Sequence, residues 1–328
     1  MIDQLIASDN TTSRIEDTLS LPIAKITPMG GDGSERSFQR IHTREKTFVY
    51  MLLPANEAKQ VHDGTYDWLA VAATLTAAGI NCPNVVATVE DGLIIEDGGD
   101  YTLNRKLNNK NRNELFAHCF AVAKQMLTIP QYPQQVWCQR RYDSQTYLRE
   151  FKFFQKMYLE RFLKLTPTMH DRLTHDFHAI SNYLAQFSKH FVHRDYHSRN
   201  IMVCDDDIML LDFQDAIIGS HFYDPLSLCF DSYTHLAPEV RMGLFMSYCA
   251  SLQQEYPNLD MHHWKPLLIQ RQLKAIGSFA RLTIDAKKGN YLRYVQPAIA
   301  CLPRQQLIDE RWSYVSDTLL TQIANSVK

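Results

Sequence analysis

The chain has 328 residues, 45% hydrophobic and 21% charged, the proportions of an ordinary globular protein with a sizeable core. A formal net charge of −2 gives no basic field, so we expect neither a nucleic-acid partner nor an anionic membrane surface. No stretch approaches the ~18 uninterrupted apolar residues of a membrane span. The seven cysteines are scattered and the start lacks a signal-peptide pattern, so we expect a cytoplasmic protein with reduced thiols.

The first hundred residues predict a small sheet with helices. Residues 1–20 are expected to form a short helix followed by a polar link, and residues 65–78 a helix that Gly79 ends. Alternating apolar and polar residues predict strands at Ile23–Met29 and at residues 36–43, 46–53, 85–89 and 93–96. The last two should form a hairpin about Asp91-Gly92, a dipeptide that favours tight turns.

Two glycine-rich segments of this region are candidates for nucleotide binding. The first follows the first strand as Gly30-Gly31-Asp32-Gly33-Ser34, where backbone N–H groups could approach a polyphosphate. The second is residues 96–100. Its backbone could form hydrogen bonds with an adenine edge, or the segment could equally be a simple linker. The nucleotide-binding candidates are Ser34, Arg36, Ser37, Phe38 and Glu96.

Beyond residue 100 the character changes from strands to helices. Apolar residues recur with helical spacing, which predicts helices at residues 114–128, 147–163, 173–187, 240–252, 264–282 and 305–327. Another helix should open at Tyr223-Asp224-Pro225. The aromatic residues on these stripes are expected to form the core, and the chain shows no internal repeat.

Residues 191–215 carry the strongest chemical signal. His193-Arg194-Asp195 precedes Asn200, and two short apolar runs, 201–203 and 208–211, flank a polar cluster before Asp212. This pattern predicts a hairpin in which Asn200 and Asp212 lie side by side. A carboxylate and an amide oxygen suit Mg²⁺, and Asp195 could take a proton from a hydroxyl.

That arrangement is the pattern of a phosphotransferase of the protein-kinase type, H-x-D-x-x-x-x-N followed by a metal-binding Asp. The alternative is a surface hairpin with an acidic tip. Asp205, Asp206 and Asp207 are expected to be a solvated turn and not metal ligands.

With these motifs, the chain resembles the aminoglycoside phosphotransferase/choline kinase-like family, and within it the bacterial N-acetylmuramate/N-acetylglucosamine anomeric kinases. The matching segments are SERSFQR (34–40), LIIEDGGD (93–100), HRDYHSRNIM (193–202), LDFQDA (211–216), YDPLSL (223–228) and QRQLKAIGSFARL (270–282).

The resemblance implies an α+β, protein-kinase-like fold with two lobes, a β-rich N-lobe of residues 1–97 and a helical C-lobe of residues 98–328. It implies ATP and Mg²⁺ as cofactors and a small-molecule sugar as substrate. By position, Asp195 is the general base, and Asn200 and Asp212 are the metal ligands. Asp224 and His193 support the catalytic loop, Asp224 through backbone amides, unless it is only a helix cap.

One departure and one open assignment remain. Met51 stands where a kinase strand carries its phosphate-binding lysine, so metal ions, backbone amides and Arg36 or Arg40 would have to hold the phosphates. An N-acetylmuramate carboxylate would need a basic partner, for which Arg271, Lys274 and Arg281 are candidates. Arg194 and Arg199 could each face the phosphoryl group or a substrate carboxylate, or could be solvated loop charges. Other acceptors (an aminoglycoside, choline or another alcohol) and a pseudokinase without turnover stay open, as does the oligomeric state.

Overall fold

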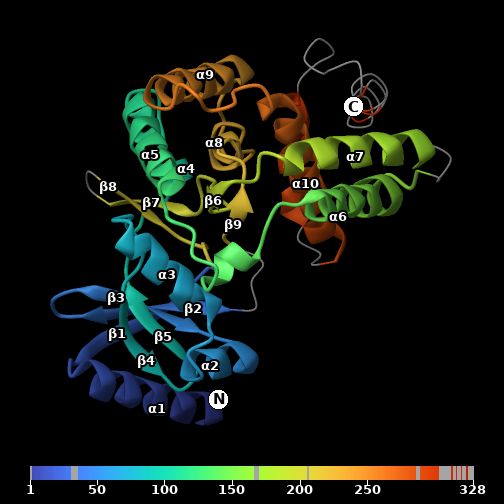
Figure 1. The fold of residues 1–328 in the computed structure, drawn as a ribbon. Coiled ribbons are helices and arrows are strands. Elements are labelled where there is room, and N and C mark those ends of the chain that lie inside the picture. The colour runs from blue at the N-terminus through green and yellow to red at the C-terminus, as the bar shows by residue number, and fades with distance from the viewer. Residues whose placement is uncertain are drawn as a thin grey trace. The chain divides into compact units, whose positions relative to one another are not determined.

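The computed structural model describes residues 2–30, 36–165, 170–204, 207–285 and 289–302, with Trp312, Val315, Leu319 and Ile323. The chain divides into two compact units, Met1–Asp100 with Met202–Gln214, and Tyr101–Ile201 with Asp215–Lys328 (Figure 1). The sequence-based division at residue 97 had put the Met202–Gln214 segment in the second lobe, whereas it packs as part of the first unit.

The first unit is built on a five-stranded antiparallel sheet of order β1-β2-β3-β5-β4 (Figure 1). Its strands are β1 (Ile23–Met29), β2 (Ser37–Thr43), β3 (Thr47–Leu52), β4 (Val85–Val89) and β5 (Gly92–Glu96). All five strands that the alternating pattern predicted are present. Gly92 is required at the start of β5, since a Cβ there would lie 2.1 Å from the Met51 carbonyl oxygen.

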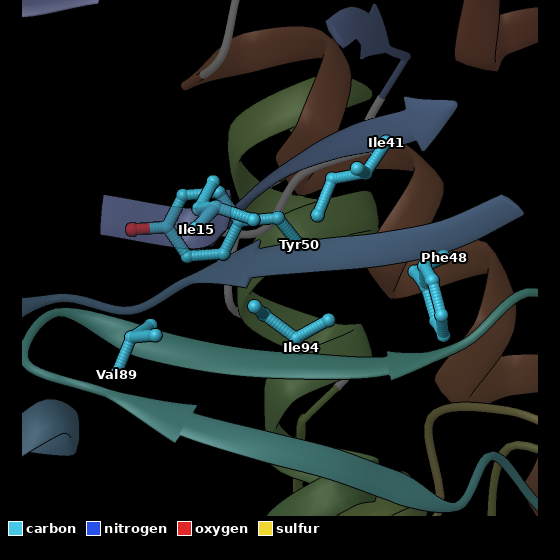
Figure 2. Packing of buried hydrophobic residues seen from close by; sticks show 6 residues of the cluster. All are labelled: Ile15, Ile41, Phe48, Tyr50, Val89 and Ile94. Atoms are coloured by element: carbon cyan, nitrogen blue, oxygen red, sulfur yellow. The ribbon is translucent and has the colours of Figure 1, made fainter. Parts of the chain in front are cut away.

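The helix α1 (Ile2–Leu19) covers this sheet through a compact apolar cluster. Its members are Ile15, Ile41, Phe48, Tyr50, Val89 and Ile94 (Figure 2). Burying a side chain of this size stabilises the fold by roughly 1.5–3 kcal/mol. Polar contacts also hold α1 on the sheet. Arg14 on α1 lies 2.8 Å from the Asp91 carboxylate, which also accepts a hydrogen bond from the Tyr50 hydroxyl.

Two helices accompany the sheet, α2 (Ala55–His62) and α3 (Asp67–Ala77). The predicted helix at residues 65–78 corresponds to α3. Sequence analysis missed α2, an eight-residue helix that buries only Ala58 and Val61.

The predicted hairpin after the catalytic motif is confirmed as β7 (Ile201–Cys204) and β8 (Asp207–Leu210). The amide of Leu210 donates to the Asn81 carbonyl over 2.9 Å, and the ring of Phe213 packs on Trp68 of α3 at 4.9 Å. These contacts explain why the hairpin packs with the first unit. The turn residues Asp205 and Asp206 lie outside the described part of the chain.

The second unit is mostly helical. Its α-helices are α4 (Leu103–Lys106), α5 (Arg112–Leu127), α6 (Ser144–Phe154), α7 (His170–Ala185), α8 (Tyr223–Cys229), α9 (Pro238–Glu255), α10 (Trp264–Ile284) and α11 (Val295–Ala300). The short 3₁₀ segments η1 (Val136–Gln139) and η4 (Gly289–Tyr294) and a two-stranded sheet of β6 (His190–Val192) and β9 (Ile217–Gly219) complete it.

One predicted helix differs in form from the structure. Residues 147–163 form α6 and then a π-helical continuation, η2 (Gln155–Phe162), along which Phe154, Tyr158 and Phe162 stack at 5.7 and 5.6 Å. The predicted helix at residues 305–327 lies almost wholly outside the described residues.

The long helix α10 is the central packing element of this unit, buried along most of its length. It approaches α6 closely at Gly277, where a Cβ would lie only 2.9 Å from the Phe154 Cα. α10 carries Arg271 and Lys274, and its packing therefore fixes their positions. No helix among the described residues is long and apolar enough to cross a membrane.

Candidate active site

The loop from His193 to Asn200 follows β6 directly and leads into β7. Its second residue, Arg194, has a φ of +80°, a left-handed conformation that strains a non-glycine residue. The buried Asp224 of α8 holds this turn, because its carboxylate accepts the backbone N–H of His193 at 2.7 Å and of Arg194 at 3.0 Å. Burial raises the pKa of Asp224 to about 7, against these two hydrogen bonds.

A second buried carboxylate holds the other end of the loop. Asp231, two residues beyond α8, accepts the backbone N–H of Ser198 at 2.9 Å and also its hydroxyl. Its other oxygen accepts the N–H of Tyr233 at 2.8 Å. Sequence analysis missed Asp231, although its position seven residues after Asp224 was a usable signal. Both ends of the loop are thus anchored by charge-assisted hydrogen bonds.

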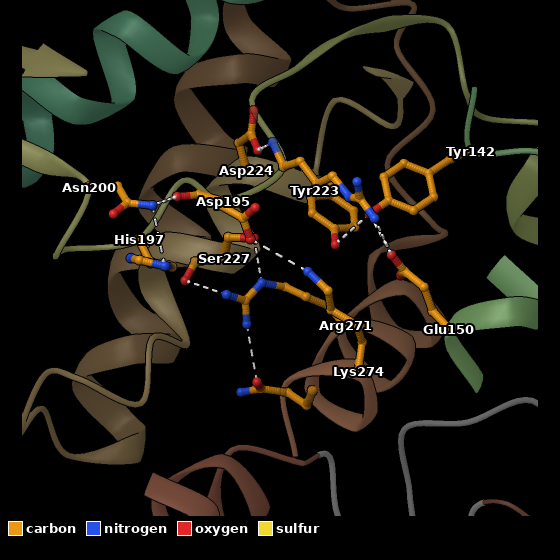
Figure 3. Close-up of polar contacts among 12 residues, drawn as sticks. Tyr142, Glu150, Asp195, His197, Asn200, Tyr223, Asp224, Ser227, Arg271 and Lys274 are labelled. Carbon is orange, nitrogen blue, oxygen red and sulfur yellow. Dashed lines mark hydrogen bonds and ion pairs between the residues drawn. The ribbon is translucent and has the colours of Figure 1, made fainter. Parts of the chain in front are cut away.

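The carboxylate of Asp195 projects beside α10, 3.5 Å from the ammonium of Lys274 (Figure 3). Its side chain is 33% exposed and that of Lys274 is 22% exposed. Burial opposes ionisation of Asp195, but Lys274, His197 and Arg194 together hold its pKa below the usual range. Burial likewise opposes the charge on Lys274, and Asp195 and Tyr223 outweigh it and raise its pKa. Near neutral pH the two groups are an ion pair.

A polar network engages the guanidinium of Arg194, which lines the same cavity as Asp195. Its guanidinium lies 3.2 Å from Glu150 of α6, and Glu150 also accepts the Tyr142 hydroxyl at 3.2 Å and the Gln270 amide at 2.8 Å. Figure 3 shows Glu150 and Tyr142 together, away from Asn200. The sequence left Arg194 open between a phosphoryl group, a substrate carboxylate and solvent; in the structure it pairs with Glu150.

Asn200 and Asp212 are the predicted metal ligands. The Asn200 amide nitrogen donates to the Asp195 carbonyl at 3.1 Å, and its oxygen points the other way (Figure 3). Asp212 stands two residues after β8 with a φ of +60° and accepts the Gln214 amide at 2.9 Å. Both supply the hard oxygen atoms that Mg²⁺ prefers, so the donor set fits that ion. Their meeting stays a prediction, because they belong to different compact units.

Arg36, at the start of β2, lies near Asp212 within the first unit. Its Nε donates to Glu57 Oε2 of α2 at 2.7 Å, and the Tyr66 hydroxyl donates to the same oxygen at 2.9 Å. Burial lowers the pKa of Arg36, but Glu57, Tyr66 and Asp212 outweigh it and raise the pKa. The side chain of Arg40 instead pairs with Asp97 and Asp100.

The remaining nucleotide candidates lie in or beside the sheet. Ser37 and Phe38 are on β2, opposite Leu52 and Met51 of β3. Met51 is buried in this sheet. Glu96 ends β5, and its carboxylate accepts the Asn84 amide at 2.8 Å. Ser34 lies outside the described residues. The structure holds these residues at the first unit's sheet, and their contact with a nucleotide stays a prediction.

A cavity of about 90 Å³ opens beside Asp195 within the second unit. Its wall includes Asp195, His197, Tyr233, Arg271, Lys274 and Phe279. A larger cavity of about 390 Å³ lies elsewhere, along α6 and α7, and its lining residues include no carboxylate. We therefore assign the candidate acceptor site to the smaller cavity, which has a base and a cation together with aromatic faces.

Two predicted substrate-binding residues are engaged by the protein itself. Arg271 is buried and donates to the Ser227 hydroxyl and, at 3.1 Å, to the Ser227 carbonyl. Arg199 lies over the ring of Tyr233, 4.0 Å from its centroid, and donates to the Tyr294 hydroxyl at 2.7 Å. Arg199 thus contacts Tyr233 of the cavity wall, whereas Lys274 faces Asp195 directly.

A sheet-based unit and a helical unit, with an aspartate on a braced loop between a short strand and a hairpin, define a kinase-like enzyme that transfers a phosphoryl group to a hydroxyl acceptor. The chain belongs to the phosphotransferase enzyme family, whose pattern it matches over residues 25–262.

Two relatives carry the same name. The chain is 28% identical over 300 residues to an N-acetylmuramate/N-acetylglucosamine kinase of Pseudomonas aeruginosa, covering 86% of each chain. It is 24% identical over 308 residues to a Caulobacter vibrioides protein of that name, covering 81% of this chain and 84% of the relative.

Solved structures confirm the predicted kinase-like fold class. An ADP-bound aminoglycoside phosphotransferase superposes with a TM-score of 0.60 at 15% identity, covering 89% of this chain and 98% of that one. An ethanolamine kinase of Plasmodium vivax gives a TM-score of 0.59 at 13% identity, covering 85% and 82%. At such identities the likeness shows the fold alone.

Proposed function

We propose that this protein is an ATP-dependent kinase for the anomeric hydroxyl of N-acetylmuramate, N-acetylglucosamine or both, acting in peptidoglycan recycling. The observation that carries the proposal is the ionised Asp195 at an aromatic-walled cavity, on a loop anchored by Asp224 and Asp231. The similarity of this chain to N-acetylmuramate/N-acetylglucosamine kinases over most of its length supports the class of acceptor.

In the proposed reaction Asp195 accepts the proton of the sugar hydroxyl while the sugar oxygen forms a bond to the γ-phosphorus. The bond from that phosphorus to the bridging oxygen breaks, and ADP leaves with its electron pair. An anomeric hydroxyl is more acidic than a simple alcohol, so an aspartate of low pKa is an adequate base. Asp195 therefore has to position the hydroxyl and accept its proton, and the anchored loop holds Asp195 in place for this.

Asn200 and Asp212 are the residues that would hold Mg²⁺, which when bound offsets the charge on the phosphate oxygens. In the first unit Arg36 is the side chain best placed to meet phosphate charge, since Glu57 fixes its Nε and Asp212 lies near it. Ser37 and Phe38, at the start of β2, are the neighbouring candidates, and Glu96 begins the segment that would meet the adenine. This arrangement replaces the missing lysine at Met51.

The cavity wall suits a sugar better than a polycationic antibiotic. Tyr233 and Phe279 present aromatic rings, against which the apolar face of a sugar ring packs well. Three cations, Arg194, Arg271 and Lys274, outnumber the carboxylates of Asp195 and Asp231 on the same wall. This balance favours an uncharged N-acetyl sugar or an acidic N-acetylmuramate over a polycationic aminoglycoside.

The test is ADP release from Mg-ATP with N-acetylmuramate, N-acetylglucosamine, kanamycin and choline assayed in parallel. We expect turnover with one or both amino sugars, and nuclear magnetic resonance of the product should place the phosphate on the anomeric carbon. Turnover of kanamycin or choline alone would contradict the amino-sugar assignment. ATP binding with no turnover of any acceptor would identify a pseudokinase instead.

A further inference from the structure

The ion pair between Lys274 and Asp195 joins two elements far apart in the chain, since Lys274 follows Asp195 by 79 residues. Its Nζ lies 3.5 Å from Oδ1 of the proposed base, and both residues line the same cavity. Resting on the proposed function, we infer that Lys274 is a catalytic residue whose ammonium contacts the phosphoryl group during its transfer. The sequence had suggested a different task for Lys274, binding the carboxylate of an acidic sugar.

Distances favour contact with the phosphoryl group over binding of an acceptor carboxylate. A hydroxyl that gives its proton to Asp195 must lie about 2.6–3.2 Å from the carboxylate, and the attacked phosphorus about 3–3.5 Å from that hydroxyl oxygen. The Lys274 ammonium lies 3.5 Å from the same carboxylate, so a hydroxyl and a phosphoryl group placed at Asp195 come within its reach. An acceptor's lactyl group, several bonds away from the anomeric hydroxyl, would sit elsewhere in the cavity.

The charge changes during transfer fit the same role. At the start, the ammonium of Lys274 offsets the negative charge of Asp195. When the proton moves from the acceptor oxygen to Asp195, this carboxyl becomes neutral, while negative charge remains on the phosphoryl oxygens and the departing ADP. Lys274 keeps its proton throughout. Its ammonium interacts first with the Asp195 carboxylate and then with the phosphoryl oxygens, so it stabilises the transition state more than the ground state.

The surroundings hold Lys274 in its charged form. Burial opposes that form, and the charges of Asp195, Tyr223 and Glu150 outweigh it and raise the lysine pKa. Arg271, one turn earlier on α10, is engaged with Ser227. Other ionisable groups that face Asp195 are His193, Arg194 and His197 on its own loop and Asp224 on α8.

The test compares Lys274→Met, which removes the charge, with Lys274→Arg, which keeps it. Lys265→Met, at the N-terminal end of α10, is the matched control. We expect Lys274→Met to lower kcat about 10²–10³-fold with N-acetylmuramate and with N-acetylglucosamine alike, with little change in the acceptor KM. Lys274→Arg should recover most of this loss, and the control should behave as wild type.

The split between kcat and KM, together with rescue by Lys274→Arg, is the readout that a merely structural lysine would not move. A raised KM for N-acetylmuramate alone, with N-acetylglucosamine turnover unchanged, would overturn the inference in favour of a carboxylate anchor. Equal loss of kcat in Lys274→Arg and Lys274→Met would overturn it in favour of structural support.

Failure of the proposed function is distinguishable from failure of this inference. If the wild-type protein phosphorylates another alcohol and neither amino sugar, the acceptor assignment is wrong, and the same variants are compared with that alcohol. An unchanged kcat in Lys274→Met would then overturn the inference by itself. A wild-type chain that transfers phosphate to no acceptor overturns both.

Discussion

Replacing Asp224 with alanine tests how the catalytic loop is held. Its carboxylate accepts two backbone N–H groups, those of His193 and Arg194, and Arg194 is in a left-handed conformation. Each buried donor left without an acceptor costs about 1–3 kcal/mol, so Asp224→Ala should lower the free energy of unfolding by about 2–6 kcal/mol. Asp224→Asn keeps the shape and one acceptor oxygen, and should lose about half as much.

The effect on turnover follows from chain connectivity. Asp195 is the next residue after Arg194, and a displacement of about 1 Å at a reacting group lowers a rate about 100-fold. We expect Asp224→Ala to lower kcat about 100-fold while the KM for ATP stays within about threefold. The assays should run near pH 8, above the Asp224 pKa of about 7.

Urea unfolding followed by circular dichroism measures the first effect, and ADP release measures the second. Glu239→Ala removes an exposed carboxylate from α9 and serves as the matched control, with a change within about 0.5 kcal/mol. An Asp224→Ala variant within about 1 kcal/mol of wild type, or with kcat within about threefold of it, would refute the bracing role.

Three further predictions concern other parts of the molecule. Glu57→Gln removes the ion pair that fixes Arg36 and should raise the KM for ATP about tenfold. An unchanged KM would show that Arg36 does not bind phosphate. Tyr233→Ala should raise the acceptor KM about tenfold and Tyr233→Phe should not, whereas equal effects would exclude ring packing. Burial lowers the pKa of His221 to about 3 and of His263 to about 4, so acid favours the unfolded chain. Between about pH 6 and 4.5 the free energy of unfolding should fall by about 1.4 kcal/mol per pH unit for each histidine. Urea titrations should show a less steep fall in His221→Phe than in the wild type, and equal slopes of unfolding free energy against pH in the two proteins would contradict this.

Much of the fold could be predicted because its signals are local. The β4–β5 hairpin follows from Asp91-Gly92, and β7–β8 from two apolar runs about a polar tip. The exceptions are short elements. The helix α2 has eight residues and buries two of them, and the strands β6 and β9 have three residues each, of which only His190 is not fully buried, so no alternation could show.

The candidate site was predictable only where its residues follow one another closely. Asp195, Asn200 and Asp212 stand in one motif, whereas Glu150 meets Arg194 across 44 residues and Lys274 meets Asp195 across 79. Helical periodicity places Lys274 on α10, but only the packing of α10 against its neighbours shows that it faces the base.

The most direct measurement of the central claim uses Asp195→Asn, which removes the proposed base and keeps its size. ADP release with the preferred sugar and ATP binding by calorimetry are measured on the same sample. The account predicts that turnover falls at least about 10²–10⁴-fold while ATP affinity stays within about threefold of wild type. A variant that still phosphorylates its acceptor at a near-normal rate would contradict it.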